Sequence, residues 1–285
     1  MGGMAVLEYP LCTPSSYVKR VIPIATSARH SAWCISWGEA QRSSIYSDPN
    51  WRGGWYTEGE EPIAGLAAAR MCALLTYRSR DSFETRFGRK AQLWAETTVA
   101  KPPTPQESTD ELKVDAQEHR TTSLFSAQGY LRYQGGKFTA RFDANCYVHI
   151  THKMDTHDVA RLRCSSSVTT PDTISGILST LPPNPLVISI QTDGLFTPSE
   201  QSLIASHIPQ AELAMIESRD GHDGFLLEFE AINNVILKFL KREFSEYYLT
   251  ALEGEEEIAQ GDGVDCFEIK KTSLFGEAEK DITSW

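Results

Sequence analysis

The stretch Glu217-Ser218-Arg219-Asp220-Gly221-His222-Asp223-Gly224-Phe225 places a histidine in a turn between two apolar segments. Residues 211–216 before it form a short apolar run that predicts a strand, and residues 225–244 after it carry the apolar spacing of a helix. A histidine at such a junction can be held by both elements while its ring faces a cleft. Because histidine can accept and donate a proton near neutral pH, His222 is a candidate general base.

A second junction of the same kind lies upstream. The β-branched run Leu186–Ile190 predicts a buried strand, and it is followed by Gln191-Thr192-Asp193-Gly194. Functional groups of open α/β sheets gather at the carboxyl ends of the strands. Asp193 followed by His222 gives the acid-then-histidine order of an α/β-hydrolase triad, in which a serine on a sharp elbow comes first.

The start of the chain is similar to the second half of such an elbow. Met1-Gly2-Gly3-Met4 opens a predicted helix over residues 2–11, and residues 18–26 predict the next strand, although Pro23 is awkward in a central strand. We expect the nucleophilic serine to lie immediately before Met1, outside these residues. Ser15 and Ser16 do not replace it, because they follow the helix.

A series of motifs in the same order resembles the homoserine O-acetyltransferase family, and is most like its fungal, methionine-biosynthesis form. The likeness runs almost from the first residue to the last. The motifs are Met1-Gly-Gly-Met4, Ala25-Thr-Ser-Ala-Arg-His30, Asp48-Pro-Asn50, Ala69-Arg-Met71, Leu75-Thr-Tyr77, Tyr130-Leu-Arg-Tyr-Gln-Gly135, Arg141-Phe-Asp-Ala-Asn145, Thr192-Asp-Gly-Leu-Phe196, Gly221-His-Asp223 and Phe275-Gly-Glu-Ala-Glu279.

The resemblance implies acetyl transfer from acetyl-CoA to the side-chain hydroxyl of L-homoserine by a ping-pong route. His222 would be the base, Asp193 would orient its ring, and the nitrogen of Met1 would correspond to an oxyanion donor. Acetyl-CoA would be a substrate, and the family's chemistry requires neither a metal nor a bound cofactor.

The acceptor of this reaction is a zwitterion, so its site needs a cation for the carboxylate and an anion for the ammonium. The positions that match the family's acceptor site are Arg70, Tyr77 and Asp223. Arg70 and Tyr77 are two turns apart on one predicted helix face, so both can reach the same cleft. Asp223 can also favour the start of the following helix through the helix dipole.

The predicted fold is an α/β-hydrolase with an inserted helical lid, lacking its N-terminal strands. We expect residues 1–29 to form the elbow helix and next strand, and residues 30–170 to form the lid. Within the lid, residues 91–122 are rich in proline and charge and predict a disordered insert. Residues 171–250 complete the hydrolase core, and residues 251–285 form a polar tail.

Composition restricts the partners and the compartment. The formal charge of −11 argues against nonspecific binding to nucleic acid or anionic membranes. Six scattered cysteines, without a C-x-x-C pair or a signal sequence, indicate reduced thiols in a cytoplasmic protein. No apolar run approaches the ~20 residues of a membrane span. We expect a soluble protein, and the family resemblance implies a possible homodimer through the lid.

Two local patterns have alternative readings. His149 and His152, with acidic residues nearby, have a spacing that could bind a metal, but no second pair of ligands supports this. A set of aromatic residues could line a substrate tunnel, although we favour a place in the core of the lid. The set is Trp33, Trp37, Trp51, Trp55, Tyr130 and Tyr133.

Two other functions stay open. The first is a related O-acyltransferase for serine or a secondary-metabolite hydroxyl, because Arg219 and Gly129 depart from the usual family pattern. The second is a non-catalytic, truncated polypeptide, whose remaining sheet would expose an apolar edge.

Overall fold

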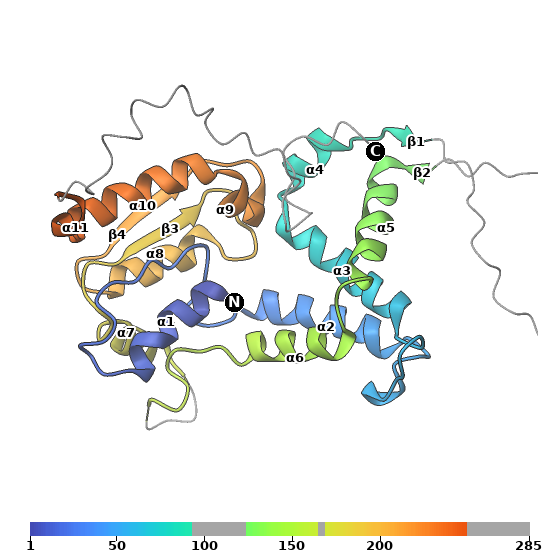
Figure 1. Ribbon diagram of the computed structural model, residues 1–285, viewed down its shortest axis with the longest axis horizontal. Coiled ribbons are helices and arrows are strands. Elements are labelled where there is room, and N and C mark those ends of the chain that lie inside the picture. The colour runs from blue at the N-terminus through green and yellow to red at the C-terminus, as the bar shows by residue number, and fades with distance from the viewer. Residues whose placement is uncertain (93–123, 165–168, 250–285) are drawn as a thin grey trace, which may run out of the picture.

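The structure is a computed structural model that describes residues 1–92, 124–164 and 169–249. Figure 1 shows two parts side by side. One part surrounds the parallel pair of strands β3 and β4, and the other is a group of helices with one short hairpin. The mixture of helices with a parallel sheet agrees with the predicted α/β class.

The sheet is built on β3 (Leu186–Ile190), whose five residues are all buried. Strand β4 (Glu212–Ile216) pairs with it in parallel, with Leu186 opposite Glu212. On the other side, the predicted strand over residues 18–26 is reduced to a single bridge between Ile24 and Ile188. The carbonyl oxygen of Pro23 accepts a hydrogen bond from the N–H of Ile188 at 2.9 Å. Because Pro23 has no N–H to donate, the segment cannot continue as a regular strand.

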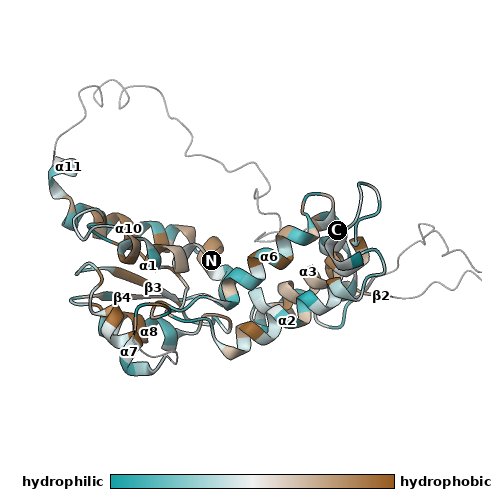
Figure 2. Cartoon of the chain, turned by 90° about the horizontal axis from the view of Figure 1, so that it is seen from below, coloured by the Kyte–Doolittle hydropathy of each residue, from teal (hydrophilic) through white to brown (hydrophobic). Residues whose placement is uncertain are grey.

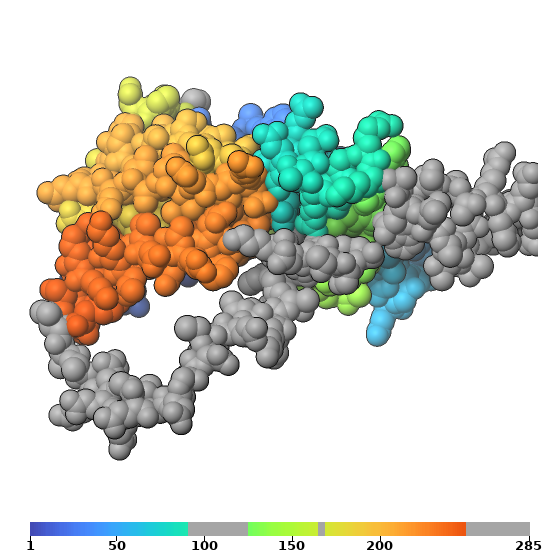
Figure 3. All heavy atoms as spheres, turned by 90° about the horizontal axis from the view of Figure 1, so that it is seen from above, coloured from blue at the N-terminus to red at the C-terminus, as the bar shows by residue number. Residues whose placement is uncertain are grey.

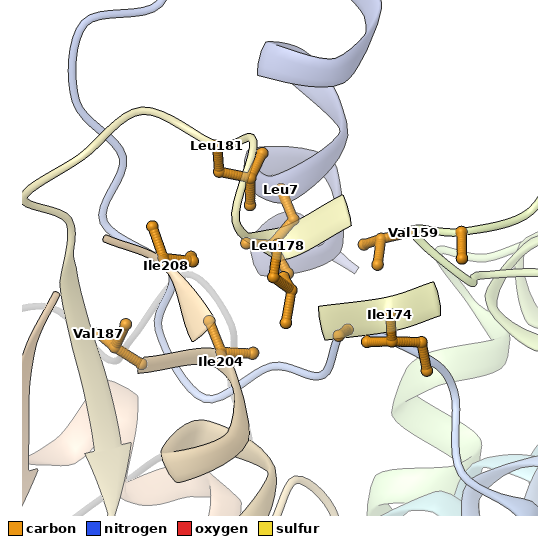
Figure 4. Packing of buried hydrophobic residues seen from close by; sticks show 10 residues of the cluster. Leu7, Val159, Ile174, Leu178, Leu181, Val187, Ile204 and Ile208 are labelled. Carbon is orange, nitrogen blue, oxygen red and sulfur yellow. The ribbon is translucent and has the colours of Figure 1, made fainter. Parts of the chain in front are cut away.

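One face of the sheet is covered by α1 (Gly2–Cys12), α7 (Pro171–Leu178) and α8 (Pro198–His207). Leu7, Leu178 and Ile204 from these helices pack with Val187 of β3, and all four are 0 % exposed. Figure 4 shows them converging in one cluster. Burying each large aliphatic side chain contributes roughly 1.5–3 kcal/mol, so this cluster fixes α1 firmly against the sheet.

The opposite face carries the C-terminal helices, α9 (Gly224–Leu227), α10 (Phe229–Glu243) and α11 (Ser245–Leu249). Ile232 and Phe239 of α10 pack against Ile188 and Ile216 of the strands. The predicted single helix over residues 225–244 is interrupted at Glu228, whose φ of −90° and ψ of 41° are not helical. The short α9 thus follows the turn of His222 directly, and α10 covers the sheet.

The helical part consists of α2 (Ala32–Tyr46), α3 (Ile63–Tyr77), α4 (Arg80–Arg86), α5 (Ser126–Thr139) and α6 (Ala144–Asp155), with a 3-10 turn η1 (Arg52–Gly54). Short strands β1 (Ala91–Gln92) and β2 (Leu124–Phe125) pair antiparallel at its end. We call this part the lid. Figure 2 shows hydrophobic and hydrophilic residues on the same helices, the pattern of helices that bury one side.

Close backbone approach and side-chain caps set the lid helices. Ser31 and Asp143 accept hydrogen bonds from the N–H groups of Cys34 and Cys146, which caps α2 and α6. At Gly65 of α3, a Cβ would lie 2.7 Å from the carbonyl oxygen of Ser44. Only glycine therefore allows α2 and α3 to pack this closely.

The expectation that the aromatic set forms lid core is wrong for part of it. Trp33 and Trp55 are 60 % and 86 % exposed, whereas Tyr130 is buried. Trp51 packs against the lid core, and Trp37 lines a cavity. Aromatic residues at helical spacing do not indicate which helix face has a partner.

The predicted insert over residues 91–122 and the tail over residues 251–285 lie almost entirely outside the described residues. The proposed domain boundaries therefore stay predictions. Within the described ranges, none of the helices has the length and apolarity needed to cross a membrane.

Candidate active site

The two sequence-predicted catalytic residues meet at the carboxyl ends of β3 and β4. His222 lies in the 3-10 turn η2 (Gly221–Asp223), and its Nδ1 is 2.7 Å from Oδ2 of Asp193. The other carboxylate oxygen of Asp193 accepts hydrogen bonds from the N–H groups of Leu195 and Phe196, both at 2.8 Å. Asp193 is thereby fixed in orientation, and a donating Nδ1 leaves Nε2 of His222 for proton transfer.

The loop that carries His222 is tied back to the loop of Asp193. The hydroxyl of Thr192 donates to the carbonyl oxygen of Ser218 at 2.9 Å and accepts from the N–H of Gly221 at 3.0 Å. The imidazole ring lies 5.1 Å from the ring of Phe196 and 4.9 Å from that of Phe225. Its side chain is 16 % exposed, so the ring is held yet still accessible.

A cavity of about 240 Å³ lies between the lid and this pair. Its walls combine aromatic, aliphatic and polar side chains and include Arg70, Tyr77, Phe138 and Leu195. Nη1 of Arg70 donates to the hydroxyl of Tyr77 at 3.2 Å, and the guanidinium lies 4.7 Å from the centre of the Phe138 ring. The Tyr77 ring is 6.5 Å from that of His222. The cavity thus holds a guanidinium, suited to bind a carboxylate; His222 and Asp193 are not among its lining residues, and Tyr77 is the wall residue that approaches the His222 ring.

Asp223 is close to this arrangement but is already paired. It is 6 % exposed and is absent from the cavity wall. Its Oδ2 lies 3.3 Å from Nε of Arg78. Burial raises the pKa of Asp223, and the positive charges of Arg78, His222 and Arg70 oppose this. Sequence analysis missed Arg78, although two aspartates flanking a candidate base, Asp220 and Asp223, are a signal that a cation is needed nearby.

Met1 lies at the N-terminus of α1, where its carbonyl oxygen accepts a hydrogen bond from the N–H of Ala5 at 3.0 Å. Burial lowers the pKa of its amino group, whereas the residue as a whole is 59 % exposed. Met4, one turn along, packs with Cys34 and with Phe196, the residue whose ring contacts His222. The start of α1 is therefore near the catalytic pair, with Phe196 between them.

A buried polar cluster closes another side of the cavity. Nη2 of Arg42 is 2.7 Å from Oδ2 of Asp155, and Nε2 of His30 lies 4.0 Å from that carboxylate. Burial lowers the pKa of His30 to about 4, although Asp155 acts in the opposite direction. His30 is therefore a neutral ring at neutral pH and joins the core to the lid.

Of the histidines near the proposed metal-binding pattern, His152 and the nearby His157 have separate partners. Nε2 of His152 lies 3.3 Å from the hydroxyl of Tyr46, and Nε2 of His157 lies 2.9 Å from the carbonyl oxygen of Ser27. Among the residues that the structure describes, no three histidine, cysteine, aspartate or glutamate side chains gather as metal ligands would.

Comparison with known proteins identifies the family. A family model described as alpha/beta hydrolase fold matches residues 1–229. The whole chain aligns at 44 % identity with a homoserine O-acetyltransferase of Cryptococcus neoformans, covering 71 % of that protein. The chain belongs to the homoserine O-acetyltransferase family. It is therefore a member of an enzyme family, on the α/β-hydrolase fold that the strand-end residues predicted.

Further relatives and solved structures agree with this family and fold. The enzyme of Saccharomyces cerevisiae is 44 % identical over the whole chain, which covers 67 % of its length. Among solved structures, the homoserine O-acetyltransferase of Bacillus anthracis has a TM-score of 0.64 at 20 % identity, with 84 % of this chain and 57 % of that one covered. Esterase E22 has a TM-score of 0.62 at 18 % identity, covering 84 % and 58 %. At these identities, the structural likeness concerns the fold.

Proposed function

We propose that this chain is part of an enzyme that transfers an acetyl group from acetyl-CoA to the side-chain hydroxyl of L-homoserine. The observation that carries the proposal is the hydrogen-bonded pair of Asp193 and His222 beside a lid cavity that holds Arg70 and Tyr77. The names of the curated relatives support the acceptor and the reaction.

In this mechanism, a serine hydroxyl attacks the thioester carbonyl while Nε2 of His222 takes its proton. The thiolate of CoA leaves and receives that proton, and an acetyl-serine remains. L-Homoserine then gives its hydroxyl proton to His222 and attacks the acetyl-serine. The ester forms, and the serine oxygen recovers the proton. Asp193 stabilises the imidazolium in both halves.

The serine is expected directly before Met1, in a longer polypeptide, since Met1-Gly2-Gly3-Met4 matches the second half of the elbow. In that polypeptide, the nitrogen of Met1 would be a backbone amide at the start of α1, where an N–H donor can stabilise the tetrahedral oxyanion. Acetyl-CoA acts as a substrate, and the reaction as proposed needs no resident cofactor or metal.

Arg70 and the hydroxyl of Tyr77 would hold the carboxylate of the acceptor, because they share one face of α3 and line the cavity. Asp223 would receive its ammonium group, since it directly follows His222 in the chain and its carboxyl interacts electrostatically with both His222 and Arg70. Association of two chains through the lid, in the cytoplasm, is part of the same proposal.

The test measures release of free CoA from acetyl-CoA with L-homoserine, and with L-serine in parallel. It compares residues 1–285 with the longer reading frame that contains the serine, each with a His222→Ala variant. We expect transfer to homoserine by the longer protein alone, and we expect the His222→Ala variant to be slower by roughly 10⁴-fold.

Turnover that prefers L-serine would favour the related acyltransferase. Absence of turnover in the longer protein would favour the alternative that the polypeptide is not catalytic. His222-dependent turnover by residues 1–285 would show that another residue carries the acetyl group.

A further inference from the structure

The lid contacts the loop of His222 through the segment Tyr77–Ser82, which joins α3 to α4. Figure 3 shows the atoms around α4, in teal, packed directly against the orange C-terminal part of the core. The side chain of Arg78 in this segment is 6 % exposed. It is the first residue after α3, the helix that also carries Arg70 and Tyr77. Its position therefore connects the cavity wall with the catalytic loop.

The guanidinium of Arg78 contacts an aspartate on each side of His222. Its Nη1 donates to Oδ1 of Asp220 at 2.9 Å, and its Nε lies 3.3 Å from Oδ2 of Asp223. Ser82 strengthens the first contact, because its hydroxyl donates to the same oxygen of Asp220 at 2.5 Å. A planar guanidinium can serve two carboxylates in fixed directions, whereas a lysine ammonium acts as a point charge. The two contacts together restrain the turn that carries the base.

The backbones of the two segments are also in contact. Gly221 has a φ of +68°, and a Cβ there would lie 2.5 Å from the nitrogen of Ser79 and 2.8 Å from the carbonyl carbon of Arg78. The hydroxyl of Ser79 donates to the carbonyl oxygen of Arg219. Such contact leaves no space for a side chain at position 221. The orientation of His222 is thus set from two sides, by Asp193 within the core and by this segment from the lid.

We propose that Arg78 is a positioning residue for the acceptor half of the acetyl transfer: by bridging Asp220 and Asp223, it holds the His222 loop at a fixed distance from Arg70 and Tyr77. The inference rests on the proposed function. It assigns to Arg78 the alignment of the acceptor hydroxyl with Nε2 of His222. A bound acceptor would contact Arg70 and Tyr77, and Arg78 acts on it only through the loop.

The bridge also favours the ionised form of Asp223. The charged groups that face this carboxyl are Arg78, His222, Arg70 and Asp220, and burial raises its pKa while Arg78 is the largest influence in the other direction. Removal of Arg78 therefore moves the pKa of Asp223 further upward. If ionised Asp223 receives the acceptor ammonium, the acidic limb of the acceptor reaction moves to higher pH in such a variant.

The experiment compares Arg78→Gln with Arg80→Gln in the longer polypeptide that carries the activity. Arg80 is a matched control, because it is exposed and lies two residues away in the first turn of α4. A ping-pong route allows each half to be measured alone, as a burst of acetyl-enzyme formation and as deacylation by L-homoserine. In Arg78→Gln, we expect deacylation to slow by ~10²-fold, the size expected for misplaced reacting groups, and the burst to slow by less than about 5-fold. Arg80→Gln should match the wild type in both halves.

The variant Arg78→Lys separates charge from geometry. We expect the pH dependence of deacylation by Arg78→Lys to keep the acidic limb of the wild type, because the positive charge is retained. Its deacylation rate should be about 10-fold lower than that of the wild type, because one ammonium does not reach both carboxylates as a guanidinium does. Equal losses in both halves of the reaction, with no change in the pH profile, would mean that Arg78 only stabilises the fold and would overturn the inference.

Hydrogen exchange on residues 1–285 tests the same contact without any activity. Arg78→Gln should raise the exchange rate of backbone amides in residues 218–224 by at least about 10-fold relative to Arg80→Gln. Unchanged exchange there would contradict the bridge even if acetyl transfer is found. Faster exchange without acetyl transfer by the longer wild-type protein would contradict the proposed function and leave the bridge intact.

Discussion

The pair of Asp193 and His222 and the lid cluster around Arg42 and Asp155 are held in different ways. Asp193 receives its hydrogen bonds from backbone groups two and three residues further along the chain and from His222, which follows the neighbouring strand β4. In the lid, by contrast, Tyr147 donates to Gln41 at a separation of 106 residues, and Arg42 pairs with Asp155. The core site thus depends on short loops after strands, and the lid depends on side chains that meet across helices. Substitutions in the pair should therefore reduce acetyl transfer most, and substitutions in the lid cluster should reduce stability most.

The largest effect is expected where the catalytic pair itself is broken. Asp193→Asn keeps the size of the side chain but removes the carboxylate that accepts the proton of Nδ1 of His222. The imidazole is then no longer held in the tautomer that leaves Nε2 free to take a proton. We expect acetyl transfer by the active, longer polypeptide to fall by roughly 10⁴-fold, measured as initial rates of CoA release. Unfolding by denaturant, followed in parallel, gives the stability of the same variant. A loss below about 10-fold would contradict the role of Asp193.

Breaking the lid cluster should damage stability more than chemistry. Arg42 has a side chain only 2 % exposed, so Asp155→Asn leaves a buried cation with the exposed Glu39 as its remaining anion. Removing one partner of a buried ion pair costs about 3–5 kcal/mol, which denaturant unfolding can measure. Glu39, which also contacts Arg42 at 2.9 Å but is exposed, provides a control. If Glu39→Gln destabilises the chain as much as Asp155→Asn, the buried pair is not the main restraint.

The junction between core and lid should give a pH dependence. Burial depresses the pKa of His30 in the folded chain to about 4, so the unfolded chain binds more protons between pH 6.5 and pH 4. The stability from neutral His30 is therefore fully present above pH 6.5 and is lost as the pH falls toward 4, by an amount on the order of 2 kcal/mol. Unfolding measured across this range should show a smaller loss in His30→Asn. The exposed His149 serves as the control, and an identical pH dependence of His149→Gln and His30→Asn would contradict the assignment.

The smallest effect is expected at a lid ion pair in solvent. Arg52 and Glu60 are 2.7 Å apart, but their side chains are 52 % and 50 % exposed. Exposed pairs contribute about 0–1 kcal/mol, so Glu60→Gln should change the free energy of unfolding by less than about 1 kcal/mol. Comparison with Asp155→Asn in the same denaturant series shows whether burial decides the strength of lid contacts. A larger loss of stability in Glu60→Gln than in Asp155→Asn would show that burial does not decide the strength of these ion pairs.

The same contrast explains what the sequence could predict. Strands β3 and β4 and the residues after them follow local patterns, so the sequence alone pointed to Asp193 and His222, and the structure places the two side chains 2.7 Å apart. The helix of Arg70 and Tyr77 was predicted for the same reason, since both lie on one face of α3. The family resemblance, now supported by relatives at 44 % identity, added the expected acceptor.

The contacts that sequence reasoning missed join distant parts of the chain. Arg78 meets Asp220 across 142 residues, and no local pattern specifies that contact. Exposure of Trp33 and Trp55 depends on which lid face has a neighbour, so periodicity alone assigned them wrongly. The strand expected over residues 18–26 is only a bridge, because a proline without an N–H stands in it.

The hairpin of β1 and β2 has a practical consequence for modified forms of this protein. Ala91 pairs with Phe125, so the residues on either side of positions 93–123 lie next to each other, at the end of the lid away from β3 and β4 (Figure 1). The free-energy cost of closing a loop grows only slowly with its length, so an insertion between two ends that are held together costs little. A fluorescent domain or an affinity tag inserted between residues 92 and 124 should therefore leave the catalytic pair undisturbed. This gives a labelling position for following the enzyme in living cells.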